Sequence, residues 1–233
     1  MVKRFFSVKV KAGFTVIELL VSLGIMITIM TTVLGNYPES NIRVNLAMLA
    51  HTITLALRET QIRGTAIDSS DLSVGGYGLF FDKATSTQFV LFKDFATVAG
   101  PNGLDVGDGV YSMIFGSDET ESITTFPYKF KVGKLCVGTG YPFTGTNNGS
   151  CDTDNTASMP TINTVTIAFV RPSPQPIITI NQDDALNKRD SISNGISGAC
   201  IEVTSESPNR EAYVRSAQVY TSGRIVASKV GCQ

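Results

Sequence analysis

The chain has 233 residues, of which 42% are hydrophobic, and a formal net charge of −1. This length suffices for one moderate globular domain with an appendage, and the near-neutral charge argues against direct nucleic-acid binding, which usually needs a basic face. Phosphate-binding loops, zinc-type Cys/His spacings and the nucleophile elbow of hydrolases are absent from the sequence, so we expect neither an enzyme nor a cofactor. The single histidine, His51, has no nucleophile or ligand set near it and is expected to be an ordinary packing or surface residue.

The N-terminus predicts a membrane segment. Residues 1–13, MVKRFFSVKVKAG, contain lysines and an arginine and no acid, and an apolar stretch from Phe14 to Leu34 follows. Its length of about 21 residues is what a helix needs to cross a hydrocarbon core of about 30 Å. By the positive-inside rule, the N-terminus stays in the cytoplasm and the rest of the chain lies outside.

Glu18 lies near the start of this apolar stretch. A carboxylate at membrane depth costs about 2.5–3.5 kcal/mol on insertion scales, so it is rarely left there without a partner. A cleaved secretory signal ending near Val33-Leu34-Gly35 is one interpretation, but its apolar region would run for only about 7–15 residues and carry no acid. A plain membrane anchor is the other, and it leaves Glu18 unexplained.

The stretch KAG followed by FTVIELLVSLGIMI resembles the N-terminus of type IV pilins and type II secretion pseudopilins. In that family a prepilin peptidase cuts after the glycine, here between Gly13 and Phe14, and methylates the new terminal amine, here that of Phe14. The family's glutamate, here Glu18, takes part in packing each subunit against its neighbour in a filament. The resemblance covers Lys11 to about Met30.

Elementary electrostatics agrees with the role that the resemblance implies for Glu18. Cleavage after Gly13 would create an ammonium or methylammonium on Phe14, beside a helix start whose unsatisfied N–H groups have positive dipole character. Glu18 is therefore expected to pair with its own terminus or with that of an adjacent subunit. A buried carboxylate with a partner specifies register more than it adds stability.

A second helical pattern covers residues 37–64. Ser40 or Asn41 is predicted to cap its start and Gly64 to end it, while Gly35 and Pro38 should kink or loosen the junction with the membrane helix. Its apolar positions recur near helical spacing and are expected to pack on the head: Ile42, Leu46, Met48, Leu49, Ile53, Leu55 and Leu57.

From residue 72 onward the pattern predicts strands, which alternate with turns rich in Gly, Asn, Ser and Pro. The residues of the Thr221–Arg224 turn predict a closing hairpin between the last two strands. The predicted strands are Gly78–Phe81, Gln88–Phe92, Ser122–Phe126, Tyr128–Val132, Thr164–Phe169, Ile177–Ile180, Cys200–Thr204, Ala217–Tyr220 and Arg224–Ala227. The expected fold class is α+β, with a long N-terminal helix packed on a β-rich, pilin-like head.

The expected organisation has four parts: a cleaved leader in residues 1–13, a transmembrane helix in 14–36, an amphipathic helix in 37–64 and the extracytoplasmic head in 65–233. The cysteines all lie in the C-terminal half, at positions 136, 151, 200 and 232. Behind a membrane segment, an even number of cysteines predicts disulfides in an oxidising compartment. Three pairings are possible, and we favour the pairing of nearest neighbours, Cys136 with Cys151 and Cys200 with Cys232.

Two acidic loops contain carboxylates that could bind a metal ion. Asp105 and Asp108 are weak candidates for Ca²⁺, a hard ion that prefers oxygen ligands, but the spacing is not that of an EF-hand and Asp-Gly is ordinary turn chemistry. Asp152 and Asp154 are expected to lie in a solvated loop. The sequence therefore predicts no metal site.

A fainter resemblance concerns the head. The stretches LALRETQIRGTAI, GGYGLFFD, FVLFKD and SGRIV resemble the H-type minor pseudopilins, which cap or initiate the type II secretion filament. The resemblance implies a structural subunit in the bacterial inner membrane, assembled with other pilins, prepilin peptidase, the assembly platform and membrane lipid. A minor pilin of a pilus for adhesion, motility or DNA uptake stays open, and so does a membrane-anchored extracytoplasmic binding protein.

Overall fold

A computed structural model of the chain describes residues 13–66, 74–99, 105–107, 109–111, 119–127, 130–138, 149–151, 162–171, 173–181, 189–190, 196–205 and 213–232. The chain divides into two compact units, Met1–Ile42 and Arg43–Gln233. Each unit is described by itself. Residues 1–12 of the predicted leader lie outside the described part, and its last residue, Gly13, lies within it.

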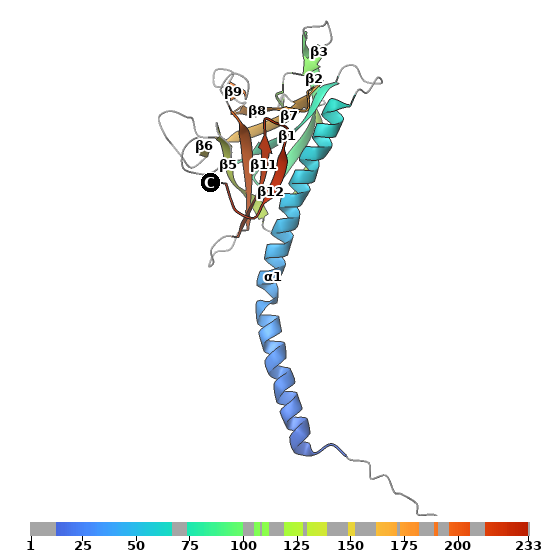
Figure 1. Cartoon of the computed structure of the whole chain (residues 1–233), viewed down its shortest axis with the longest axis vertical. Helices are drawn as coiled ribbons and strands as arrows, with labels where there is room; N and C mark the ends of the chain where they lie inside the picture. Colours follow the sequence, from blue (N-terminus) through green and yellow to red (C-terminus); the bar gives the residue numbers. More distant parts are fainter. Residues whose placement is uncertain are drawn as a thin grey trace, which may run out of the picture. The chain divides into compact units, whose positions relative to one another are not determined.

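Helix α1, Val16–Thr65, runs for 50 residues (Figure 1). Its backbone is helical through residues 36–40, so the predicted new start at Ser40 or Asn41 is wrong. A proline removes one hydrogen bond from the helical ladder, and the turns on both sides of Pro38 keep the helix going without a second cap. Gly35 and Pro38 therefore do not interrupt the helix.

The helix ends one residue beyond Gly64, the predicted stop. A Cβ on Gly64 would clash with the backbone carbonyl of Phe169 in strand β7 (Thr164–Val170) and would lie 2.8 Å from the Cβ of Phe169. Glycine is therefore present because helix and sheet approach closely here, and the left-handed cap expected of a stop signal is not its role.

The described strands form two sheets in which every pair is antiparallel. Among the described residues, the first has seven strands in the order β3-β2-β1-β7-β8-β9, with β4 also paired to β2. Besides β7, this first sheet contains β1 (Val74–Asp82), β2 (Gln88–Ala99), β3 (Asp105–Gly107), β4 (Thr120–Thr125), β8 (Pro176–Ile180) and β9 (Arg189–Asp190). The second, in the order β12-β11-β10-β5-β6, has β5 (Phe130–Gly138), β6 (Gly149–Cys151), β10 (Gly198–Ser205), β11 (Val214–Tyr220) and β12 (Ile225–Ser228).

The chain is therefore α+β, with an N-terminal apolar helix and a β-rich body, as the sequence predicts at this level. Every predicted strand overlaps an observed one, although Tyr128 lies outside the described residues. Strands β3, β6 and β9 were missed because two or three residues are too few to show alternation. The predicted last hairpin is present, since β11 pairs with β12 across a turn in which Gly223 has a φ of 84°.

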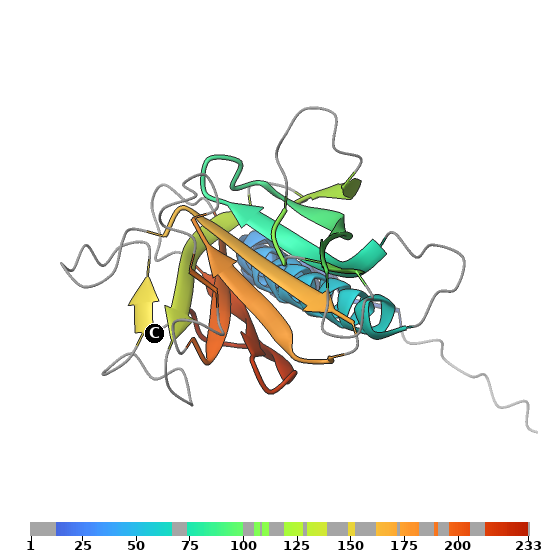
Figure 2. The ribbon, with the colours of Figure 1, turned by 90° about the horizontal axis from the view of Figure 1, so that it is seen from above.

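The core of the body lies between the sheets and one face of the Arg43–Thr65 part of α1 (Figure 2). That face contributes fully or almost fully buried Leu46, Leu49, Ala50, Ile53 and Leu57. The side-chain amide of Gln61 donates hydrogen bonds of 3.0 Å to the carbonyls of Pro174 and Gly223, which belong to connections in the first and the second sheet. Burial of each large aliphatic side chain contributes about 1.5–3 kcal/mol, so this face holds α1 to both sheets.

Two disulfides lie in the second sheet and follow the pairing favoured from the sequence. Cys136 on β5 bonds to Cys151 on β6, and Cys200 on β10 bonds to Cys232 near the C-terminus. Cys136 is the register partner of both Cys151 and Cys200, so the four cysteines form a single buried cluster. The backbone N–H of Cys232 also donates a 3.0 Å hydrogen bond to the buried carboxylate of Glu202.

Candidate functional site

The apolar part of α1, Val16–Gly35, is long and apolar enough to cross a membrane, and none of it is buried within the chain. Some signal sequences near an N-terminus are also long and apolar enough to meet this criterion, so length and composition alone do not distinguish an anchor from a signal. The polar side chains within the segment do carry further information.

The hydroxyl groups of this segment are satisfied within the helix. Ser22 donates to the carbonyl of Leu19 at 2.9 Å, and each threonine donates to a carbonyl three or four residues back. Such bonds let hydroxyls enter lipid or a protein interior at little cost. Within the described part of the chain, the carboxylate of Glu18 has no hydrogen bond or ion pair. Glu18 is therefore the one polar side chain of this segment that still needs a partner.

Thr15 provides the N-cap of α1. Its side-chain oxygen accepts a 3.3 Å hydrogen bond from the backbone N–H of Glu18, and Glu18 is the acid in the first turn. Thr15 and Glu18 thus have the spacing of a capping box, in which the acid also favours the positive end of the helix dipole. Sequence reasoning missed Thr15, although the pattern T-x-x-E before an apolar run is the known signal.

The proposed cleavage position precedes the helix. Gly13, Phe14 and Thr15 are non-helical and exposed, and Phe14 exposes 76% of its surface. A Cβ on Gly13 would meet no atom within 4 Å, so the fold of the described chain does not require glycine there. A requirement for glycine at this position must therefore come from outside the folded chain.

In the body, α1 exposes a second apolar surface on the face that points away from its core. This surface, here called the outer stripe, has side chains that remain half to two-thirds exposed: Val44 at 49%, Met48 at 62%, Leu55 at 62% and Ile62 at 68%. Met48 and Leu55 were expected to pack on the head, and this expectation is wrong. Met48 lies one residue before Leu49, and Leu55 lies two residues before Leu57. At 100° per residue, their side chains therefore point about 100° and about 200° away from these buried neighbours. His51 lies on the same helix and is also exposed.

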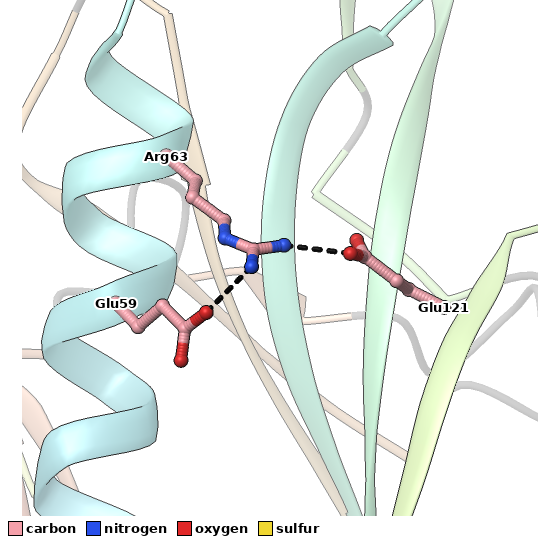
Figure 3. Close-up of polar contacts among 3 residues, drawn as sticks. All are labelled: Glu59, Arg63 and Glu121. Carbon is pink, nitrogen blue, oxygen red and sulfur yellow. Dashed lines mark hydrogen bonds and ion pairs between the residues drawn. The ribbon is translucent and has the colours of Figure 1, made fainter.

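Figure 3 shows a charged cluster formed by Glu59, Arg63 and Glu121. Arg63 forms ion pairs of 2.6 Å with Glu59, one turn earlier on α1, and with Glu121 on β4. Its guanidinium also lies 5.8 Å from the ring of Tyr77 on β1. The hydrogen bond that Arg63 donates to Glu121 raises the pKa of Arg63 despite partial burial, so Arg63 stays charged at any physiological pH.

The cluster forms one wall of a groove of about 440 Å³ between α1 and strands β2 and β4. Leu55 and Ala56 line it from the helix, and Phe89 and Leu91 line it from β2. Since one guanidinium pairs with two carboxylates, the groove combines an apolar floor with a partly exposed ion-pair network whose formal charge is −1.

The loop that contains the weak calcium candidates is organised by a different acid. Asp94 on β2 is completely buried and accepts a 2.7 Å hydrogen bond from the backbone N–H of Gly109. Asp105 lies in strand β3, whereas Asp108, Asp152 and Asp154 lie outside the described residues. Within the described ranges, no group of three or more potential ligand side chains comes together. The strand predicted from the sequence ends at Phe92, two residues before Asp94, so the sequence pattern does not indicate that Asp94 is buried.

The stretches that resemble H-type pseudopilins meet one another in the fold. Gln61 bonds to Gly223, Arg63 contacts Tyr77, and a Cβ on Gly78 would collide with Phe92. Each of these contacts joins α1 or β1 to a neighbouring strand or turn. The shared residues therefore build the body around the helix and do not converge on a ligand.

Comparisons of the chain with protein-family models, curated proteins and solved structures gave no match. Function is therefore inferred from Glu18, the outer stripe and the residues around Gly13.

Proposed function

We propose that the chain is a structural subunit of a pilus-like filament, anchored by α1 in the bacterial inner membrane before assembly. The observation that carries the proposal is the exposed apolar surface of α1. A helix that served only as an anchor would need apolar residues in Val16–Gly35 and no others. Yet α1 also exposes Val44, Met48, Leu55 and Ile62 in the body, beyond the length that a bilayer requires.

The carboxylate of Glu18, which has no partner among the described residues, supports the same proposal. A charge kept in an apolar helix despite its desolvation cost suggests a partner supplied by another molecule. The amine created by cleavage after Gly13, on the same or a neighbouring subunit, has the required positive charge. Thr15 caps the helix, so the N-terminus of the cleaved chain would still begin with an ordered first turn.

Within this class we favour a minor pseudopilin of a type II secretion system, of the H type, because the stretches with that resemblance build the body. A minor pilin for adhesion, motility or DNA uptake shares the same anchor and outer stripe. The proposed partners are other pilins or pseudopilins, prepilin peptidase and the assembly platform in the membrane.

One observation favours a function of a different class. The groove between α1 and β4 is large enough for a few side chains of a ligand, which would suit a membrane-anchored extracytoplasmic binding protein. Leu55 belongs to both the groove and the outer stripe, so one experiment distinguishes the two functions.

A photo-crosslinking amino acid in place of Leu55 provides the test. The filament proposal predicts cross-links to a second pilin-like subunit, and their loss when Glu18→Ala is added without any change in membrane fractionation. A crosslinker in place of Ser222, exposed in the β11–β12 turn, is the control for non-specific capture. Cross-links from Leu55 that persist unchanged in the Glu18→Ala background, or that reach only proteins unrelated to pilins, would contradict the proposal.

A further inference from the structure

Strand β4 lies at an edge of the first sheet. Among the described strands, it pairs only with β2. Just beyond one end of β4, the backbone N–H of Phe126 donates a 2.8 Å hydrogen bond to the carbonyl of Thr87, which precedes β2. Just beyond the other end, the N–H of Lys93 on β2 donates a 2.7 Å hydrogen bond to the carbonyl of Glu119. These two bonds fix which backbone groups of β4 face β2.

The backbone groups of an antiparallel strand face its two neighbours alternately. Since the N–H of Phe126 faces β2, the backbone groups of Thr124 and Ser122 face β2 as well. Ile123 and Thr125 therefore direct their N–H and C=O groups to the other side. Within the described part of the chain, neither of them has a backbone hydrogen bond on that side. A further strand can bond to both residues there.

A bulge shapes the other half of β4. The register advances from Ser122 to Thr120 on β4 while it advances by one residue on β2, which leaves Glu121 as an extra residue. The side chain of Glu121 points toward α1 and pairs with Arg63 at 2.6 Å (Figure 3). Bulges redirect a side chain and disrupt regular pairing. The ion pair therefore holds β4 beside α1, and the open pairing positions lie in the half beyond the bulge.

The residues of this open half suit pairing with another strand. Ile123, Thr124 and Thr125 are all β-branched, and such side chains are favoured in strands. Ile123 exposes 55% of its surface, and Thr125 is also exposed. Natural edge strands often carry Lys or Pro, which prevent pairing with other chains, and none of these three residues is either. An exposed edge of this kind binds extended segments by strand addition.

The groove beside β4 indicates which molecule supplies the extended segment. Ser122 and Thr124 line the groove from β4, and Leu55 lines it from α1. Leu55 also belongs to the outer stripe, which is proposed above to contact a second subunit. The edge of β4 is therefore continuous, across the groove, with the proposed subunit interface.

We propose that the open edge of β4, residues 123–125, pairs with an extended segment of the neighbouring filament subunit. This inference rests on the proposed function and adds a backbone contact that apolar packing of α1 does not require. Successive side chains of a strand point to opposite faces of its sheet. Alternate side chains of the incoming segment therefore lie on the face that holds the groove, where Phe89 and Leu91 provide an apolar floor.

Hydrogen exchange of the full chain in detergent, resolved by residue with NMR, tests whether the edge is open. The amides of Thr124 and Phe126, which face β2, should exchange at least about tenfold more slowly than those of Ile123 and Thr125. Equally slow exchange at all four amides would show that the edge is already covered and would overturn the proposal.

A photo-crosslinking amino acid in place of Thr125 tests the partner in cells that assemble the filament. We expect cross-links to a second pilin-like subunit, and about fivefold fewer in Ile123→Pro, which is the effect of one lost hydrogen bond on an equilibrium. Ile123→Pro removes an N–H that the pairing with β2 does not use, so an edge strand tolerates it. Ile123→Ala loses the side chain but keeps this N–H, and as the matched control it should retain most of the cross-links.

Thr125→Pro, with the crosslinker in place of Ile123, repeats the test if far-UV circular dichroism shows that Ile123→Pro does not fold. Equal losses in Ile123→Pro and Ile123→Ala would overturn strand addition. Cross-links from Thr125 that are absent, or that reach only proteins unrelated to pilins, while Leu55 still captures a subunit, would overturn this inference and leave the filament proposal intact. Failure of Leu55 to capture a subunit would refute both proposals.

Discussion

The two disulfides differ in the length of chain that each closes, which gives a quantitative prediction of stability. Cys136–Cys151 closes a separation of 15 residues and Cys200–Cys232 one of 32 residues. In the chain-entropy model, these loops correspond to about 3.0 and about 3.7 kcal/mol of stabilisation at 25 °C. Removal of both cysteines of a pair by alanine should lower the free energy of unfolding of the body by these amounts.

Loss of Cys200–Cys232, which closes the longer loop, should therefore lower the free energy of unfolding by about 0.7 kcal/mol more than loss of Cys136–Cys151. For a body of this size, about 2–4 °C of Tm accompanies each kcal/mol, so Cys200→Ala/Cys232→Ala should lower the Tm by about 7–15 °C. Near-UV circular dichroism of the tyrosines follows guanidinium and thermal unfolding of the full chain in detergent. A loss below about 1 kcal/mol for either pair, or a larger loss for the shorter loop, would refute the reasoning from loop entropy.

Glu18→Ala should leave cleavage and membrane insertion unchanged, because removal of the carboxylate eliminates a desolvation cost, yet it should abolish entry into filaments as measured by cross-linking to neighbouring pilins. Incorporation at the wild-type level would exclude an assembly role for Glu18. Gly64→Ala should destabilise the body by about 1–3 kcal/mol despite the better helix propensity of alanine, because its Cβ would clash with the carbonyl of Phe169. Gly24→Ala, where a Cβ meets nothing within 4 Å, is the matched control, and an equal Tm for both variants would contradict the close packing.

The sequence predicted the elements of the fold well and their surroundings less well. Alternation and turn residues located the longer strands, because a half-buried strand must alternate. Helical periodicity identified the buried positions Leu46, Leu49, Ile53 and Leu57 but also assigned Met48 and Leu55 to the same face. Apolar side chains that await a partner look the same in a sequence as those that are already buried.

The sequence identified Glu18 in the candidate site but not the ion pairs of Arg63. Glu18 stood out because a charge in an apolar run is costly wherever the segment lies. Arg63 and Glu121 could not be paired from the sequence, since they are 58 residues apart and meet only when β4 pairs with β2 beside α1.

The mass of the mature N-terminal peptide tests the central claim most directly. When the full chain is expressed together with a prepilin peptidase, the account predicts a peptide that begins at Phe14 with one methyl group on its amine. Gly13→Val should abolish this product and leave the leader attached to a membrane-bound chain. A mature N-terminus near Gly35, as a secretory signal would give, or cleavage at Phe14 that persists in Gly13→Val, would contradict the account.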